Sequence, residues 1–297
     1  MPSNKKRLHI IVNPKSGVGK HNLLESYLEK HLDKATFDLT IKNTLKPGDA
    51  KVFSGEAAAT GVDYVVAAGG DGTINEVARE LIGSNTALGI IPIGSGNGLA
   101  HHLKIPLNPA AAIDIINKQN VKRIDTVHIN NQLFVSIAGV GFDAKVARRF
   151  AKSKQRGFLS YFKIVSQEYT SYKPQKYTIE LDDKKFETEA LLIGFANSNQ
   201  FGYNTQISPG AKIDDGLIDV CIVKKAPLIE LPRIAHLLYW GQIDKSRYVE
   251  IIQTKEIRVH QKKNKNINLD GETIRLGKEL RIRINPLSLK ILTPQKS

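Results

Sequence analysis

The chain has 297 residues, which favours two domains that are each large enough to bury a hydrophobic core. Lysine and arginine together number 43 against 29 acidic residues, and the net charge of +14 suits nucleotide phosphates, nucleic acid or an anionic membrane surface. The single cysteine excludes an intrachain disulfide, and no apolar run reaches signal-peptide or transmembrane length, so we expect a cytoplasmic protein.

The first third of the chain alternates predicted strands and helices. Short apolar runs predict strands over 8–12, 37–41, 64–68 and 88–93. Helical periodicity predicts helices over 23–32, 49–59, 74–82 and 110–116, the last with Asn108 as N-cap and Pro109 at its first position. This order predicts a doubly wound α/β domain over residues 1–124, with a parallel sheet and helices on its faces.

After about residue 123 the sequence pattern changes to short predicted strands separated by polar turns. Strands are predicted over 125–129, 133–138, 177–181, 186–193, 217–223, 255–259 and 279–284. Asn130-Asn131 and Asp182-Asp183 are plausible hairpin turns, and one helix is predicted over 228–239. The second domain, residues 125–285, is therefore predicted to be mostly antiparallel β.

A glycine-rich turn follows the apolar strand at 64–68. It reads Gly69-Gly70-Asp71-Gly72-Thr73 and leads directly into a predicted helix. Glycine lets the backbone approach a ligand closely, and the helix N-terminus presents N–H groups and the positive end of its dipole. The turn is thus suited to phosphate, although an ordinary tight strand-to-helix turn is the alternative.

Two further loops of similar composition follow apolar strands, at 13–17 and at 94–98. The carboxyl ends of parallel strands meet at one edge of an open sheet, where ligands bind. Three such loops together predict a nucleotide site. The stretch 17–21 is not a P-loop, because His21 stands where serine or threonine is needed, and Gly139–Ala144 lacks the βαβ surroundings of a dinucleotide fold.

The second half contains two Asp-Gly turns, at 214–216 and 270–272. Asp-Gly is a common hairpin turn, and that interpretation is sufficient on spacing alone. Phosphoryl transfer to an alcohol, however, needs a carboxylate to accept the hydroxyl proton and Mg²⁺ to spread the phosphate charge. Acidic turns near a phosphate loop could supply both.

Residues 145–163 contain seven basic residues and no acid, and Phe150, Phe158, Leu159, Tyr161 and Phe162 are interspersed among them. Two interpretations stay open for this stretch: peripheral contact with an anionic membrane, or an ordinary solvated helix face. No nucleic-acid recognition motif is present.

Taken together, the motifs resemble the diacylglycerol kinase catalytic family. The matching blocks are Asn13-Pro14-x-Ser16-Gly17, the run from Gly69 to Glu76, Gly94-Ser95-Gly96-Asn97, Gly141–Ala144, Asp214-Asp215-Gly216 and Asp270-Gly271-Glu272. This family includes soluble bacterial lipid kinases and the sphingosine and ceramide kinases, with NAD kinases as distant relatives. The likeness spans nearly the whole chain, and its strongest block is Gly-Gly-Asp-Gly-Thr.

The resemblance implies a nucleotide-binding α/β domain, a C-terminal antiparallel β-sandwich, and an active site in the cleft between them, with residues 286–297 returning to the first domain. It implies ATP binding by Asn13, Pro14, Lys15, Ser16, Gly17, Thr44, Gly70, Asp71, Gly72, Thr73, Ile74, Asn75, Glu76 and Ser95, with Glu272 contacting the nucleotide. Asp270 would act as general base, and a magnesium ion would be held by the Asp215 side chain and the carbonyl groups of Lys212 and Leu217.

One departure concerns Asn97-Gly98-Leu99, where many bacterial diacylglycerol kinases read Asn-Asp-Phe. The missing carboxylate belongs to the network that joins magnesium to the active site, so the magnesium network and the lipid's identity stay open. We expect an ATP-dependent lipid kinase that acts at the membrane surface. The alternatives are a kinase with a soluble acceptor such as NAD and a catalytically silent lipid-binding protein, and a homodimer is an open possibility.

Overall fold

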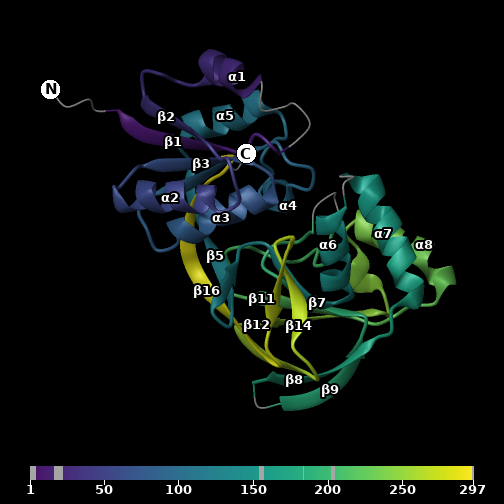
Figure 1. The fold of residues 1–297 in the computed structure, drawn as a ribbon. Helices are drawn as coiled ribbons and strands as arrows, with labels where there is room; N and C mark the ends of the chain where they lie inside the picture. The colour runs from purple at the N-terminus through teal and green to yellow at the C-terminus, as the bar shows by residue number, and fades with distance from the viewer. Residues whose placement is uncertain (1–4, 17–22, 154–156, 183, 202–204, 296–297) are drawn as a thin grey trace. The chain divides into compact units, whose positions relative to one another are not determined.

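The computed structural model describes residues 5–16, 23–153, 157–182, 184–201 and 205–295. Gly17 of the first loop, and with it the rest of 17–21, lies outside these ranges. The chain divides into two compact units, one made of Met1–Ile124 with Leu287–Ser297 and the other of Asp125–Pro286 (Figure 1). The boundaries between the units fall within two long strands, β5 (Val121–Ile129) and β16 (Glu279–Leu292).

The first unit is built on a parallel sheet. Its strands run in the order β2-β1-β3-β4, and the end of β16 pairs in parallel with β4 at Ile291 and Leu88. Helices α1 and α5 pack together, as do α2 and α3, and the two pairs lie on opposite faces of the sheet (Figure 1). The bounds are β1 Lys6–Val12, α1 Leu24–His31, β2 Phe37–Asn43, α2 Asp49–Ala59, β3 Tyr64–Gly69, α3 Asp71–Leu81, β4 Ala87–Pro92, α4 Gly98–His102 and α5 Pro109–Lys118.

The local sequence explains these elements. Every residue of β3 and β4 is buried, as expected for central strands of a parallel sheet with helices on both faces. Helix α5 begins where the sequence predicts, because the Asn108 side chain accepts a hydrogen bond from the Ala110 N–H and Pro109 follows at the first position. Helix α3 begins at Asp71, three residues earlier than the periodicity alone predicts.

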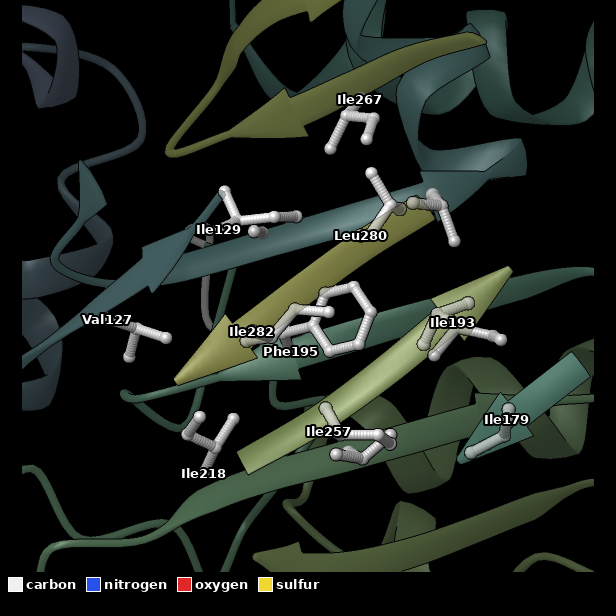
Figure 2. Packing of buried hydrophobic residues seen from close by; sticks show 14 of the residues in the cluster. Val127, Ile129, Ile179, Ile193, Phe195, Ile218, Ile257, Ile267, Leu280 and Ile282 are labelled. Carbon is white, nitrogen blue, oxygen red and sulfur yellow. The ribbon is translucent and has the colours of Figure 1, made fainter. Parts of the chain in front are cut away.

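The second unit contains two antiparallel sheets. One runs from the first part of β16 through β13 and β8 to β9, and the other runs β12-β11-β10-β7-β14-β15. Apolar residues of both sheets, mostly branched aliphatic ones, form the core between them, among them Ile179, Ile193, Phe195, Ile257 and Ile282 (Figure 2). The predicted α/β plus β-sandwich fold class is therefore confirmed. The bounds are β6 Gln132–Phe134, β7 Ile137–Gly141, α6 Phe142–Lys152, α7 Phe158–Ser171, β8 Gln175–Leu181, β9 Lys184–Ala190, β10 Leu192–Ala196, β11 Ile218–Val223, η2 Leu228–Glu230, α8 Leu231–Tyr239, η3 Ile243–Lys245, β12 Val249–Thr254, β13 Glu256–Gln261, β14 Lys265–Leu269 and β15 Glu272–Leu276.

Two predicted strands are each divided between the sheets. The strand predicted over 133–138 is β6 followed by β7, and the one predicted over 186–193 is β9 followed by β10. Each was predicted as one strand because the residues on both sides of the break contribute apolar side chains to the same core. Helices α6 and α7 are not among the predicted elements, and neither are β12, β14 and β15. Within the described ranges, no helix combines the length and the apolar character needed to cross a membrane.

Candidate active site

Asp71 connects the second glycine loop to the third. It is the first residue of α3, and its carboxylate accepts backbone N–H bonds from the loop after β4, Oδ2 from Asn97 and Oδ1 from Gly98, each at 2.8 Å. Burial raises the pKa of Asp71, while the N–H bonds from Gly98 and Asn97 favour the ionised form. The carboxylate therefore fixes the position of one loop relative to the other.

The glycines in these two loops are required by close packing. A Cβ on Gly94 would lie 2.3 Å from the Gly70 Cα atom, and one on Gly96 would lie 2.7 Å from Oδ2 of Asp71. Real Cβ atoms do not approach other heavy atoms so closely, so alanine at Gly94 would push the loops apart. The second and third loops thus form one contiguous backbone surface.

The first loop joins this surface through a side-chain contact. The Asn13 Nδ2 atom donates to Oγ1 of buried Thr73 at 3.0 Å, and its own Oδ1 accepts from the Lys15 N–H at 3.0 Å. The Ser16 N–H donates to the Asn13 carbonyl, which closes the turn. All three predicted loops are therefore connected at the carboxyl ends of β1, β3 and β4, next to the N-terminus of α3, where an anion is favoured.

The remaining residues predicted to bind nucleotide have different surroundings. Thr44 is buried and donates its N–H to the Val12 carbonyl at the end of β1, and Ser95 is exposed in the third loop. Ile74 is fully buried, so its backbone alone could meet a ligand. Glu76 accepts the Gly48 N–H with both oxygens at 3.2 Å, which holds the start of α2.

Asn97 lies in the third loop, and the assignment from sequence left it out of the candidate binding residues. It adopts the left-handed conformation with φ of 51°, and its Nδ2 donates to the Gly94 carbonyl at 2.9 Å. Its Oδ1 is buried and has no hydrogen-bond donor among the described residues. A buried acceptor without a donor is costly, so a ligand N–H or hydroxyl at this loop would be stabilising. The sequence feature that could have pointed to Asn97 is its position as the last residue of the Gly-Ser-Gly-Asn block.

In the second unit, Asp270 and Gly271 form the two-residue hairpin turn between β14 and β15. Both have positive φ, 49° and 92°, as a type I′ turn requires. The buried Asp270 carboxylate also accepts three backbone N–H bonds, all at 2.8 Å: Oδ2 from Val135, and Oδ1 from Ser136 and Ile137. These contacts lie between β6 and β7 and explain why the apolar run at 133–138 is not one strand. Glu272, the other acid of the turn, is exposed.

A buried carboxyl group supports this turn from behind. The Asn268 Oδ1 atom accepts the Gly271 N–H at 2.9 Å, and its Nδ2 donates to Oδ2 of Asp143 at 2.9 Å. A Cβ on Gly139 would lie 2.1 Å from that same oxygen. The Gly139–Ala144 motif therefore makes room for a carboxyl group rather than for a dinucleotide. Burial raises the pKa of Asp143 to about 6, with the Asn268 hydrogen bond acting in the opposite direction.

The raised pKa of Asp143 predicts that the free energy of unfolding depends on pH. Because folded Asp143 holds its proton up to about pH 6 while the unfolded value is 3.8, the free energy of unfolding falls as pH rises through that interval, by at most about 3 kcal/mol. Asp143→Asn should remove this titration and make the protein more stable above pH 6. Chemical denaturation of both proteins between pH 4 and pH 8 measures the difference. A difference that does not grow with pH would contradict the assignment, and Asp143→Ala, which leaves Asn268 Nδ2 without its acceptor, should be less stable than Asp143→Asn.

The Asp214-Asp215-Gly216 turn lies in a group of acids. Oδ2 of buried Asp125 accepts the Gly216 N–H at 2.7 Å, and Oδ1 of Asp215 accepts the Leu217 N–H at 3.0 Å. Burial raises the pKa of Asp215, the Leu217 N–H lowers it, and the charges of Asp219 and Asp125 raise it further. The described residues include no cluster of three or more acids, histidines or cysteines with metal-ligand geometry. A cation at Asp215 would need backbone carbonyl ligands as well.

The basic stretch 145–163 spans parts of helices α6 and α7, and several of its side chains contact other residues of the protein. Rings of Phe150 and Tyr161 pack edge to face at 5.6 Å, while Lys145 and Arg149 form ion pairs with Glu168. Leu159 and Phe162 of α7 are 82% and 55% exposed. The Phe158 side chain, like residues 154–156, is outside the described part.

These features define a class of protein: a parallel α/β unit with glycine-rich loops at the carboxyl ends of its strands, joined in sequence to an antiparallel sandwich with acidic turns. Two family models match the chain, the diacylglycerol kinase catalytic domain over residues 7–129 and the YegS C-terminal NAD kinase beta sandwich-like domain over residues 136–293. The chain therefore belongs to the diacylglycerol kinase catalytic domain family.

Individual relatives agree with this membership. The chain is 31% identical over 275 residues to a diacylglycerol kinase of Bacillus subtilis, covering 90% of each protein. It is 31% identical over 264 residues to a probable lipid kinase YegS-like of Pseudomonas aeruginosa, covering 88% of this chain and 86% of that one. Among solved structures, it resembles a candidate diacylglycerol kinase from Bacillus anthracis with a TM-score of 0.79 at 27% identity, covering 98% and 97% of the two chains.

Proposed function

We propose that the protein is an ATP-dependent lipid kinase that transfers the γ-phosphoryl group to the hydroxyl of a diacylglycerol-like or sphingosine-like lipid. The observation that carries the proposal is the connected surface of three loops, held by Asp71 and Asn13, at the carboxyl ends of β1, β3 and β4. Such a surface presents backbone N–H groups and a helix N-terminus to phosphate. The curated relatives named diacylglycerol kinase and lipid kinase support a lipid acceptor over NAD.

ATP is proposed to bind through Asn13–Gly17, Thr44, Gly70–Glu76 and Ser95. The backbone contributes most of these contacts, since Ile74 is buried and Glu76 holds the Gly48 N–H. Transfer then requires the γ-phosphorus and the lipid hydroxyl within about 3–3.5 Å of each other and in line. Little covalent chemistry is left to the protein, so positioning and charge stabilisation supply most of the acceleration.

The proton acceptor for the lipid hydroxyl is proposed to come from the Asp270-Gly271-Glu272 turn. The family resemblance implies this role for Asp270 and a nucleotide contact for Glu272. The three N–H bonds to Asp270 occupy most of the acceptor positions of its two oxygens and favour a structural part for it. Exposed Glu272 is then the second candidate for the base.

Magnesium is proposed to bind at Asp215, with the backbone carbonyls of Lys212 and Leu217. Burial raises the pKa of Asp215, and the negative charges of Asp219 and Asp125 raise it further, while the charge of Lys212 lowers it. The neighbouring negative charges favour a cation there. The ion would add a fixed positive charge to this acidic group. The chain lacks a carboxylate at Gly98, and the Gly98 N–H instead donates to Asp71.

The test of the lipid kinase proposal compares acceptors directly. The protein is incubated with labelled ATP and Mg²⁺, and either a total lipid extract or NAD is supplied. We expect label in the lipid fraction alone, and its loss when a chelator removes Mg²⁺. Label in NAD would favour the soluble-acceptor alternative, and no label in either would favour a silent lipid-binding protein.

Contact with an anionic membrane is proposed through α7, where exposed Leu159 and Phe162 stand beside exposed Lys163. Leu159→Ser with Phe162→Ser should weaken binding to vesicles that contain phosphatidylglycerol by about tenfold, because two apolar side chains lose their insertion. Co-sedimentation measures this, and Leu107→Ser, at an exposed leucine of the first unit, is the matched control. Equal binding by the double variant and the wild type would rule out this face.

A further inference from the structure

The second unit contains a lysine-lined pocket that the proposed kinase site does not use. Its volume is about 460 Å³, and it lies where the start of β8 meets the neighbouring strands β9, β13 and β14. It is lined by Lys173, Pro174, Gln175, Lys176, Glu189, Lys262 and Lys265. Lys265 begins β14 and Asp270 follows that strand, so about 16 Å of extended chain separates the pocket from the acidic turn.

Positive charge in this pocket is largely uncompensated. Of the residues that the structure describes, four lysines and one acid line it, and this acid, Glu189, stands opposite Lys176 in the β8–β9 ladder. In the described part of the chain, no acid forms an ion pair with any of these four lysines. An anion in the pocket would therefore gain attraction that the protein itself does not satisfy.

One lysine is held in place by its neighbours. The Lys265 Nζ atom donates to Oε1 of Gln175 at 2.8 Å and lies 5.8 Å from the centre of the Tyr177 ring. The Gln175 Nε2 atom in turn donates to the Lys173 carbonyl at 2.7 Å. Burial lowers the pKa of Lys265, and the charge of Lys263 lowers it further. A bound anion would favour the charged ammonium against both effects.

We infer that this pocket binds a phosphate ester, either a soluble phosphorylated molecule or the phosphate headgroup of a lipid. Lysine ammonium groups act as point charges toward phosphate oxygens, and an excess of positive charge suits a group that carries more than one negative charge. The volume exceeds that of inorganic phosphate and leaves room for a small organic part. Among the described residues, no aromatic side chain lines the pocket, so the base stacking typical of nucleotide and nucleic-acid sites has no platform there.

The experiment titrates the whole protein with glycerol 3-phosphate by calorimetry, without added nucleotide. Lys176→Gln and Lys265→Gln should each weaken binding about fivefold or more, which corresponds to about 1 kcal/mol per lysine. Lys224→Gln, at an exposed lysine outside the pocket, is the charge-matched control. Glycerol should show no binding.

A second arm uses phosphatidylcholine vesicles with and without phosphatidic acid. If the pocket variants lose binding to glycerol 3-phosphate but still bind vesicles with phosphatidic acid, the ligand is a soluble phosphate ester. If they lose binding to vesicles with phosphatidic acid but keep their binding to vesicles without it, the ligand is a lipid headgroup. Equal behaviour of pocket and control variants toward both probes would overturn the inference. The experiment compares variants that all lie in the second unit. Its result therefore tests the pocket even if the first unit proves not to bind ATP.

Discussion

Asp71→Asn should lower kcat/KM for phosphoryl transfer by about 100-fold or more while the protein stays folded. The carboxylate accepts two N–H bonds from the third loop, and asparagine has one oxygen in place of two. Either the Asn97 or the Gly98 N–H then faces an amide donor, and the loops that carry Gly70 and Gly94 separate. Misplacement of phosphate by about 1 Å is enough to cost two orders of magnitude.

Steady-state kinetics with ATP as the varied substrate measures this loss, and fluorescent nucleotide binding shows how much of it is affinity. Asp63→Asn is the matched control. Asp63 belongs to the same unit, accepts the Arg7 N–H at 2.9 Å and pairs with Lys6 at 3.2 Å on the surface, away from the loops. It should leave kcat/KM nearly unchanged. Normal kinetics in Asp71→Asn would contradict the assignment of Asp71 to the phosphate site.

The first unit could be predicted from sequence because its signals are local. Alternating apolar strands and amphipathic helices set the parallel sheet, and the Asn108-Pro109 start of α5 is one confirmed detail. The three glycine loops follow from the same order, since strand ends in a parallel sheet share one edge. What the sequence could not supply was the pairing of Asp71 with the third loop, which depends on a contact 26 and 27 residues away.

The second unit was predicted less completely than the first, for a related reason. Its strands change sheet where a side chain from elsewhere intervenes, as Asp270 does between β6 and β7 across more than 130 residues. Helices α6 and α7 cover the sandwich with aromatic and apolar residues, while their basic residues led to the interpretation as a surface stretch. The Gly139–Ala144 motif could be excluded as a dinucleotide site, but its role in seating Asp143 appears only in three dimensions.

The second large effect on transfer is expected at the acidic turn. Its two carboxylates, Asp270 and Glu272, have different surroundings, so their substitution should have different consequences. Asp270→Asn should abolish transfer and also destabilise the protein, since an amide cannot accept all three N–H bonds from Val135, Ser136 and Ile137. Each buried N–H left without an acceptor costs about 1–3 kcal/mol. Glu272→Gln changes an exposed side chain, so its stability should stay at the wild-type value.

The two variants together decide which carboxylate accepts the proton. If Glu272 is the base, Glu272→Gln should reduce kcat by about 10²–10⁴-fold at unchanged stability, with ATP affinity preserved. If Asp270 is the base, Glu272→Gln should keep most of its kcat and show its defect in nucleotide binding. Single-turnover transfer measures the chemical step, and chemical denaturation measures stability. Full transfer in both variants would contradict both assignments, because neither carboxylate would then be required to receive the hydroxyl proton.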